Sequence, residues 1–474
     1  MRKTLMIHSR SWPIWATVGL TLLIWLASKW YYADWFDNPY HYPAKTASLT
    51  ATVLMCWSMI LAARVRFLET FFGGLDKIYQ VHKRIGKAAF FIIFVHPLFL
   101  AADRLPDPVN FLLGLWFKWP EGDRYLWGHN LGIVTLLLFA ALIILTLWAT
   151  PAYHIWKKTH EWLGLVLLLV LVHVFVVQKD VAAYPLLTVW IYSFLFLGLC
   201  SFVWIRFLYW RHGPKYEYAV DRIGHQGDII KLILSPRGEK MDFWPSQFIY
   251  LVIHKEGISP EPHPYSIASG YNLEASFRLG IKQVGDHTRS LDRLEKGDKV
   301  SVYGPYGRFS EPFLSGTRDC VFIGGGIGIT PFLGMWHVAL HSEEQLPEQD
   351  VPEQLRTTHP EIIRTWKSPR VSLFYVCREL EEAGFDRDIR KEIELCHLQG
   401  FKNPEQRGHS YELYLSSERG RVTADYFAKK VGGLKDKFIF LCGPQAMTDD
   451  LTRQMLDMGV APELIIMEEF NLLD

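Results

Sequence analysis

Two strongly apolar stretches each carry a pair of histidines, and this combination constrains the chain more than any other feature. His82 and His96 are 14 residues apart, and His160 and His173 are 13 residues apart. On a helix, each pair spans about 20 Å, a large part of the thickness of a bilayer. Ionisable residues inside a membrane are costly, face the interior of a helix bundle and are usually functional. The pattern therefore predicts a membrane bundle whose histidines hold two haems, one above the other.

A structural role for these histidines, as hydrogen-bonded residues between helices, is the alternative. It fits one histidine well but fits four at matched depths poorly, because His82 then pairs with His160 and His96 with His173. Bis-histidine ligation fills both axial positions of haem iron and suits electron transfer. A spacing of 14 returns a straight helix to nearly the same face, whereas 13 leaves it roughly 140° away. Either the two haems are rotated about the membrane normal, or the helix of His160 tightens locally.

The composition separates a membrane part from a soluble part. The chain has 474 residues, is 50% hydrophobic and carries a formal net charge of +1. Long charge-free runs fill the first 210 residues, and an ordinary soluble mixture follows. The charge gives no indication of nucleic-acid binding. The six scattered cysteines predict neither a disulfide framework nor a zinc site.

Six apolar windows predict six membrane-spanning helices. They are about Trp12–Ala27, Thr46–Ala63, Ala88–Ala102, Leu131–Thr150, Trp162–Val177 and Tyr184–Ile205. The first starts after Arg10 and lacks a cleavage site of small residues, so we expect a retained anchor. Short loops on one side carry fourteen Lys and Arg, and those on the other side carry six, including Lys179. This asymmetry predicts that the N-terminus and the segment after the sixth span lie in the cytoplasm. The expected location is a bacterial inner membrane.

The predicted outer connection, Asp103–Asn130, is rich in aromatic residues, namely Trp116, Phe117, Trp119 and Trp127. Aromatic residues gather where a membrane meets water, so an interfacial belt is one interpretation. The alternative is a lid over the outer haem.

After Pro214 the pattern changes to short alternating strands, which predicts a small antiparallel β-barrel. The strands are Tyr216–Ile223, Asp228–Leu234, Gln247–Ile253, Ala275–Ile281 and Lys299–Tyr303. Three motifs follow one another here: His263-Pro264-Tyr265-Ser266, Gly285-Asp286-His287-Thr288-Arg289 and Gly304-Pro305-Tyr306-Gly307. An aromatic residue beside a hydroxyl can cover a flavin ring and donate to its polar edge. Backbone amides near Gly285 and Thr288, with Arg289, can hold a pyrophosphate.

From Asp319 the pattern indicates a doubly wound α/β domain. A buried strand leads into Gly324-Gly325-Gly326-Ile327-Gly328-Ile329-Thr330-Pro331 and an apolar helix from Phe332. Glycines let the backbone approach a pyrophosphate, and the N-terminus of a helix favours its charge. A structural turn is the alternative, but later strands favour nucleotide binding. These strands are Val371–Val376, Tyr411–Leu415 and Phe438–Leu441, the last ending in Cys442-Gly443-Pro444.

The chain therefore divides into three expected domains. Residues 1–212 form a six-span haem-binding domain, residues 213–316 an FAD-binding β-barrel, and residues 317–474 an NAD(P)H-binding domain of the ferredoxin-reductase type. The polar, proline-containing segment His341–Ser368 is predicted to be a mobile insertion.

In this order, the motifs resemble the NADPH oxidase and ferric reductase superfamily over nearly the whole chain. The resemblance implies that His82, His96, His160 and His173 ligate haem iron. It implies flavin contacts at His263–Ser266 and nicotinamide contacts at Gly324–Pro331 and Cys442–Pro444. It places four residues next to the reacting rings, namely Tyr265, Ser266, Cys442 and Phe470, with Phe470 shielding the flavin.

The activity that the resemblance implies is transmembrane electron transfer. Electrons from cytoplasmic NADPH would pass through FAD and two b-type haems to dioxygen outside, forming superoxide. Reduction of ferric iron or its chelates is the nearest alternative, and electron delivery to another membrane or periplasmic protein is the third. Lys45 falls at the outer end of the second span, where oxidase relatives carry a cation. Such a cation can stabilise superoxide, although an interfacial lysine that extends to the water is an equal alternative. Membrane lipid surrounds the bundle, and the sequence identifies no protein partner.

The choice of nicotinamide cofactor depends on one arginine. The run Phe-Tyr-Val-Cys-Arg that ends at Arg378 resembles the family segment whose arginine contacts the 2′-phosphate of NADPH. Glu379 follows at once, and an acidic residue favours NADH because it binds the 2′-hydroxyl. A solvated surface arginine is the alternative. NADPH is the expected cofactor, with NADH as the second choice.

Overall fold

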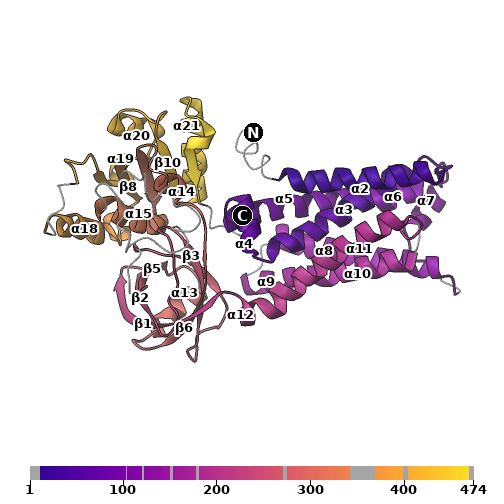
Figure 1. Cartoon of the computed structure of the whole chain (residues 1–474), viewed down its shortest axis with the longest axis horizontal. Helices are drawn as coiled ribbons and strands as arrows, with labels where there is room; N and C mark the ends of the chain where they lie inside the picture. The colour runs from indigo at the N-terminus through magenta and orange to yellow at the C-terminus, as the bar shows by residue number, and fades with distance from the viewer. Residues whose placement is uncertain are drawn as a thin grey trace. The chain divides into compact units, whose positions relative to one another are not determined.

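A computed structural model of the chain describes residues 11–102, 104–119, 122–149, 153–177, 181–270, 275–341, 369–398 and 404–468. The chain divides at His212 and Gly213 into a helical unit and a second unit that contains both β-sheets (Figure 1). Three sequence predictions lie outside the described residues: the role of Phe470, the insertion after His341, and the position of Lys179.

The helical unit consists of apolar helices joined by short connections. Its longer helices are α2 (Trp12–Tyr31), α3 (His41–Ala62), α5 (Leu75–Ile93), α8 (Arg124–Leu147), α10 (Leu163–Val177) and α11 (Pro185–Val203). Its shorter helices are α4 (Arg66–Phe72), α6 (Val95–Ala102), α7 (Pro108–Gly114), α9 (Tyr153–Glu161), the π-helical turn Trp204–Leu208 and α12 (Tyr209–His212). Helices α5 and α6 form one span, as do α9 and α10. Within the described residues, five helices are long and apolar enough to cross a membrane. The predicted count of six is therefore not confirmed.

Helix α2 occupies the place of the first predicted span, and its polar residues lower its hydropathy. Two of them make contacts between helices: Thr17 Oγ1 accepts a 2.8 Å hydrogen bond from Trp57 of α3. Thr21 Oγ1 accepts another, also 2.8 Å long, from Trp190 of α11. Such bonds hold helices together where the surroundings provide no hydrophobic driving force.

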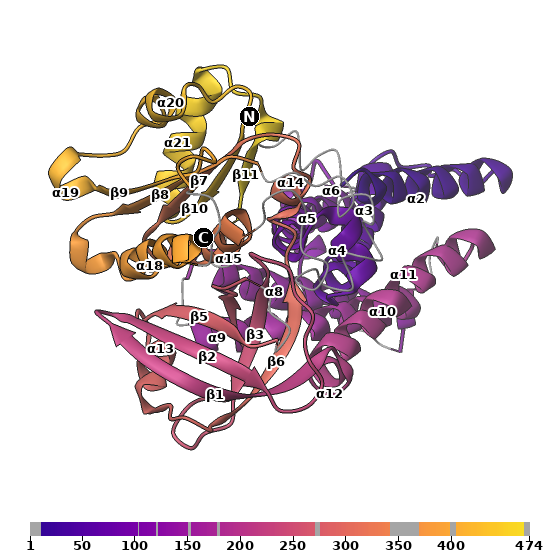
Figure 2. The same cartoon turned by 60° about the vertical axis from the view of Figure 1, so that its left-hand side comes forward.

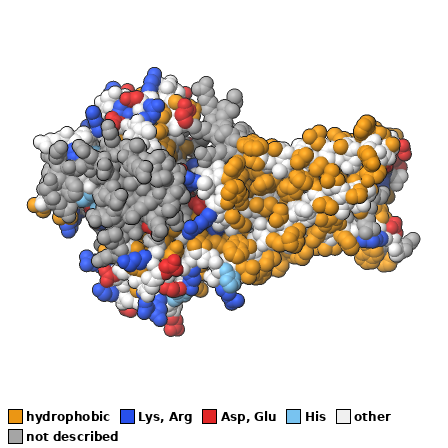
Figure 3. Space-filling view, in the orientation of Figure 1, with side chains coloured by type: hydrophobic (Ala, Val, Ile, Leu, Met, Phe, Trp, Pro, Cys, Tyr) orange, Lys and Arg blue, Asp and Glu red, His pale blue; other side chains and the backbone are white. Residues whose placement is uncertain are grey.

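The outer surface of the helical unit is apolar. Figure 3 shows hydrophobic side chains over most of its visible face. Leu137, Phe175 and Val189 are examples, with 58%, 56% and 66% of their surface exposed. Soluble proteins rarely expose contiguous apolar patches of this kind. Together with the five apolar helices, this surface identifies an integral membrane protein.

The first part of the second unit is a six-stranded antiparallel sheet with the order β4-β3-β6-β1-β2-β5. The strands are β1 (Lys215–Gln226), β2 (Ile229–Pro236), β3 (Phe248–Ile253), β4 (His263–Ser266), β5 (Phe277–Lys282) and β6 (Lys299–Tyr306). The two ends of the sheet approach each other, because Ile267, just after β4, bridges to Leu279 of β5. The curled sheet encloses a core that includes Val220, Leu232 and Ile249. The predicted antiparallel barrel fold is thus confirmed.

The second part is a five-stranded parallel sheet with the order β11-β10-β7-β8-β9. Its strands are β7 (Cys320–Gly325), β8 (Val371–Cys377), β9 (Ser410–Leu415), β10 (Phe438–Cys442) and β11 (Ile465–Met467). Helices α15 (Thr330–His341) and α18 (Asp386–Leu398) lie on one face, and α20 (Ala424–Val431) and α21 (Gln445–Asp457) on the other (Figure 2). Shorter helices are α13 (Asp286–Ser290), α14 (Glu311–Leu314) and α19 (Ser416–Arg419).

The side chains of β7 point alternately to the two faces of the parallel sheet, which explains why helices cover both faces. Phe322 belongs to the core formed with α15 and α18, whereas Ile323 belongs to the core formed with α20 and α21. Successive side chains of a strand point to opposite faces, so a strand that is apolar throughout needs a helix layer on each side. The strand order reverses beside β7, which has β8 on one side and β10 on the other. In open α/β sheets, ligands bind at the carboxyl ends of the strands at such a point.

Candidate functional site

The inner histidine pair comes together between α5 and α9. The ring centroids of His82 and His160 are 5.9 Å apart. Bonds between imidazole nitrogen and a transition metal are about 2 Å long, so two rings at this separation can share one metal atom. His160 also stacks on Trp156, with a centroid distance of 5.1 Å and an angle of 12°.

All four histidines have an oriented Nδ1. His82 Nδ1 is 2.9 Å from the carbonyl oxygen of Ser58, and His96 Nδ1 is 2.9 Å from that of Ala44. His173 Nδ1 is 2.8 Å from the carbonyl oxygen of Gly128. A carbonyl only accepts hydrogen bonds, so each of these Nδ1 atoms carries the proton and leaves the Nε2 lone pair for a ligand.

The Nδ1 atom of His160 also carries the proton, but its acceptor is a hydroxyl group. Its Nδ1 is 3.4 Å from Thr146 Oγ1, and this hydroxyl donates its own proton to the carbonyl of Leu142 at 2.7 Å. Thr146 therefore accepts from His160, and Nε2 is again the unprotonated nitrogen. Hydrogen bonds of this kind fix the tautomer and orientation of histidines that ligate metals. The four residues thus fit axial ligands of haem iron.

The helix that carries His160 and His173 changes locally between them. Trp162 separates α9 from α10. The N–H of Trp162 donates to Thr159 O at 3.2 Å, and the N–H of Leu165 donates to Trp162 O at 3.0 Å. Both bonds join residues three apart, as in the tighter 3₁₀ helix. The helix thus tightens locally between His160 and His173, but at about 20° of extra turn per 3₁₀ residue this makes up only part of the roughly 140° difference.

The outer pair has two neighbours that bear on its chemistry. A Cβ atom on Gly132 would lie 2.7 Å from His173 Cε1, so glycine makes room for the ring. Lys45, next to Ala44 on α3, lies close enough for its charge to act on both His96 and His173. The sequence placed Lys45 at this end of the second span but gave no signal for Gly132.

The aromatic outer connection is partly helical, because it contains α7 and the first turns of α8. Trp116, Trp119 and Trp127 are 67%, 82% and 58% exposed. Such exposed rings fit the interfacial belt better than a lid.

The predicted flavin residues lie on β4 and its neighbours. Phe248 of β3 is in register with Ser266 on one side and with Tyr306 of β6 on the other. The hydroxyl groups of Tyr265 and Tyr306 are buried and have no hydrogen-bond partner among the described residues. Burial raises the pKa of Tyr265 far above its usual value, so its hydroxyl remains a donor. Buried polar atoms in native proteins are normally satisfied, so this arrangement fits the polar edge of a flavin ring.

A second part of the predicted flavin site lies at α13. His287 stacks on His263 with a centroid distance of 3.6 Å, and both its ring nitrogens are buried without a partner among the described residues. Arg289 is exposed. Thr288 Oγ1 accepts from the amides of Val284 and Gly285 at 3.0 Å each. The Gly285 amide, predicted to hold a pyrophosphate, is therefore engaged by Thr288.

The two predicted nicotinamide motifs meet at the reversal of the strand order. Gly324 and Cys442, at the carboxyl ends of β7 and β10, are paired in register. A Cβ atom on Gly328 would lie 2.5 Å from the carbonyl oxygen of Cys442 and 2.7 Å from Gly443 Cα. Thr330 then begins α15, whose N-terminus points the helix dipole at this turn. Gly328 therefore allows the two motifs to form one surface.

Gly328→Ala is expected to disrupt this surface, because a methyl group cannot fit against backbone. We expect nucleotide affinity to fall about tenfold or more, as losing 1.4 kcal/mol of binding energy would produce. Titration of the purified protein with NADP⁺ measures it. Gly238→Ala is the matched control, because a Cβ atom there meets nothing within 4 Å. Equal affinity of both variants would contradict the assigned contact.

Cys442 is buried at this junction. Burial, together with the nearby Glu468 carboxylate, raises the pKa of its thiol well above the usual range. The group is thus a neutral thiol at neutral pH, which suits a contact residue and not a thiolate nucleophile.

Arg378 follows β8, the strand next to β7. Its backbone is fixed, since its N–H donates to Glu382 Oε2 at 3.1 Å and its carbonyl accepts from Ser417 at 3.0 Å. Its side chain is 75% exposed, with Nε 3.9 Å from Glu379 Oε1. The position after β8 suits contact with the ribose of a nucleotide. The side chains of Arg378 and Glu379 are both exposed to solvent.

Three protein families match consecutive parts of the chain. They are the ferric reductase like transmembrane component over residues 47–171, the oxidoreductase FAD-binding domain over 218–310 and the oxidoreductase NAD-binding domain over 322–453. The matches follow the order of the helical unit, the antiparallel sheet and the parallel sheet.

Individual relatives are more distant. The chain is 26% identical over 241 residues to the gamma subunit of sulfhydrogenase 2 from Pyrococcus furiosus, covering 48% of this chain and 72% of that protein. It is 24% identical over 270 residues to a flavohemoprotein of Bordetella pertussis, where the match covers 53% of this chain and 60% of that protein. The FAD/NAD-binding domain of nitric oxide dioxygenase from Vibrio cholerae matches with a TM-score of 0.41 and 21% identity, over 55% of this chain and 99% of that domain.

The family matches and the two sheets establish FAD- and NAD(P)H-binding domains, and the apolar helices establish a membrane domain of the ferric reductase type. The chain is therefore an NAD(P)H-dependent transmembrane oxidoreductase, and it belongs to the NADPH oxidase and ferric reductase superfamily.

Proposed function

We propose that the chain transfers electrons from cytoplasmic NADPH to dioxygen on the other side of the membrane, forming superoxide. When bound, FAD accepts a hydride, and two b-type haems carry single electrons onward. The observation that carries the proposal is the state of the four histidines. Each is held at Nδ1 and offers Nε2, and the rings of His82 and His160 lie 5.9 Å apart.

The other residues then have distinct tasks. Tyr265, Ser266 and Tyr306 contact the flavin ring, and the Gly324–Pro331 turn with Cys442–Pro444 binds the nucleotide. Arg289 approaches the flavin pyrophosphate, and Phe470 shields the ring. We place the boundaries of the three domains at residues 212 and 316 and count α2 as a membrane span, which brings the number of spans to six. We assign the second unit to the cytoplasm from the distribution of Lys and Arg.

Lys45 favours dioxygen over ferric ion as the acceptor. Its charge acts on both outer histidines, so an acceptor there meets a positive group. A cation stabilises the negative charge that develops on superoxide, but it repels Fe³⁺. An anionic ferric chelate and a protein acceptor remain the alternatives that an experiment must separate.

The test is turnover of the full chain in detergent, with NADPH, under air and under argon. Rapid NADPH consumption in air, with cytochrome c reduction that superoxide dismutase inhibits, is the expected result. Turnover under argon that depends on a ferric chelate would establish the reductase instead. Reduction of the protein without turnover in either condition would indicate an electron-delivery subunit.

Lys45→Gln is expected to lower the rate of superoxide formation about tenfold, since one stabilising charge is lost where the product forms. The rate at which NADPH reduces the protein under argon should stay unchanged. Lys118→Gln is the control, because Lys118 is a lysine of the aromatic connection, where its backbone pairs with the Asn130 side chain. Equal rates in both variants would show that Lys45 has no part in the outer reaction.

A further inference from the structure

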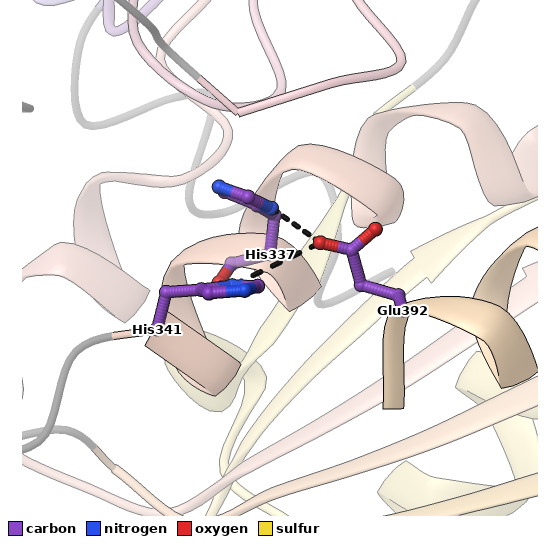
Figure 4. A group of neighbouring side chains, drawn as sticks. All are labelled: His337, His341 and Glu392. Atoms are coloured by element: carbon purple, nitrogen blue, oxygen red, sulfur yellow. Dashed lines mark hydrogen bonds and ion pairs between the residues drawn. The ribbon is translucent and has the colours of Figure 1, made fainter. Parts of the chain in front are cut away.

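A group of metal-ligating side chains lies between α15 and α18, outside the sites described above. His337 and His341 are four residues apart on α15, so they share one face of the helix. Glu392 projects from α18 toward both, as Figure 4 shows. Its Oε1 is 2.5 Å from His337 Nδ1 and 3.8 Å from His341 Nδ1. The ligand atoms of the three residues all lie within 4.8 Å of one another.

The donor set indicates the class of metal. Two imidazoles and one carboxylate are a common set of protein ligands for Zn²⁺, with water in the fourth position. Imidazole also suits Cu²⁺ and Ni²⁺, whereas Mg²⁺ and Ca²⁺ prefer oxygen ligands throughout. The side chains of His337, His341 and Glu392 are 40%, 18% and 29% exposed, so solvent reaches the group. An accessible site with three protein ligands is suited to metal exchange.

Neighbouring contacts hold the ligands in place. Asp388, one turn before Glu392 on α18, pairs with Arg278 at 3.1 Å and also with Lys231 of the antiparallel sheet. A Cβ atom on Gly270 would lie 2.4 Å from His337 Cδ2, so glycine at this position admits the imidazole. Gly270 follows β4, the strand of the flavin motif. Contacts with the antiparallel sheet and with the loop after β4 therefore position the two helices that carry the ligands. This positioning reduces the reorganisation that metal binding requires.

We propose that His337, His341 and Glu392 form an exchangeable site for a divalent transition metal, with Zn²⁺ as the preferred ion. The metal would replace the contact between His337 and Glu392 with coordinate bonds and tie α15 to α18. Because α15 begins at the glycine-rich turn and passes Gly270, the site joins an element of the nucleotide domain to the loop after the flavin strand.

The experiment uses the full chain in detergent, purified without a polyhistidine tag and stripped with a chelator. Zn²⁺ is titrated calorimetrically, and X-ray absorption at the zinc edge identifies the ligands. We expect a site with nitrogen and oxygen ligands, including two imidazoles and no sulfur, that excess Mg²⁺ does not compete for. His337→Ala and Glu392→Gln should each weaken zinc binding by about 100-fold, since outer contacts alone contribute 10- to 100-fold.

His225→Ala is the matched control. His225 also faces a carboxylate, with Nδ1 3.6 Å from Asp292 Oδ1, but belongs to no three-ligand group among the described residues. It should bind zinc as the wild type does. Glu392→Gln preserves the size of the side chain, so it decides the question if His337→Ala loses its flavin. Zinc affinity that is the same in wild type and Glu392→Gln, or a zinc spectrum with sulfur ligands, would overturn the proposal and leave the group as an ion pair between helices.

Discussion

Replacing His82 or His160 by alanine is expected to lower the haem content from two per chain to one and to abolish transmembrane electron transfer. Each substitution removes one of two imidazoles whose ring centroids lie 5.9 Å apart, a separation at which they can share one metal atom. His96→Ala or His173→Ala should remove the other haem. The pyridine haemochrome assay, divided by the protein concentration, measures the ratio directly.

The two classes of variant should differ in what NADPH can reduce. Under argon, His96→Ala should retain a haem that NADPH reduces, whereas the haem left in His82→Ala should stay oxidised. His212→Ala is the control, because His212 is exposed at the end of α12 and belongs to neither histidine pair. A ratio near one haem in the wild-type protein would refute the two-haem proposal.

Arg378→Ala is expected to lower kcat/KM for NADPH ten- to hundredfold and to leave that for NADH nearly unchanged. A charge-assisted arginine–phosphate contact contributes roughly 1.5–3 kcal/mol, at about 1.4 kcal/mol per factor of ten. The guanidinium is 75% exposed on a fixed backbone, so the substitution removes a charge without opening a cavity. NADH lacks the 2′-phosphate and cannot lose this contact.

The measurement is kcat/KM for both cofactors in wild type and variant. Arg453→Ala is the matched control, because Arg453 on α21 is 72% exposed and lies at neither nucleotide motif. Equal losses for NADPH and NADH in Arg378→Ala would show that Arg378 does not read the phosphate. A rise in NADH activity in Glu379→Gln would contradict a role for Glu379 in binding the ribose hydroxyl.

The sequence predicted the parts of the fold that have a strong periodic signal. The longer strands of both sheets and the glycine-rich turn lie close to where alternation and turn residues indicated, because these patterns are local. Strand β4, four residues long, was recognised only as a motif. Strand β11 was missed since it is three residues long and depends on pairing with β10. A local tightening of the helix of His160 was one of two explanations, but its position at Trp162 was not predicted, because so short a change leaves no trace in hydropathy.

In the candidate sites, too, the residues with a local signal were predicted and those that depend on distant segments were not. The four histidines were recognisable from residue type and spacing, but their hydrogen-bond acceptors were not, since carbonyl groups carry no residue signature. Gly132 and Gly270 make room for imidazoles from distant segments, which no local pattern reveals. The group of His337, His341 and Glu392 was missed for this reason as well, because its third member comes from another helix.

The way the four histidines are oriented has a consequence for natural variation. Within the described residues, His82, His96 and His173 are each held by a main-chain carbonyl, and every amino acid supplies one. Substitution at Ala44 therefore preserves an acceptor. At Ser58 it would also remove a hydroxyl that lies 3.0 Å from His82 Nδ1, and at Gly128 a Cβ atom would lie 2.7 Å from Val177 Cγ2. His160 depends on the Thr146 side chain. Mutation of Thr146 would therefore change the basicity of His160 as a ligand and, with it, the redox potential of the metal that it binds. Positions 58 and 146, whose hydroxyl groups contact His82 and His160, are thus where substitution can adjust the potential of one centre while leaving its ligands intact.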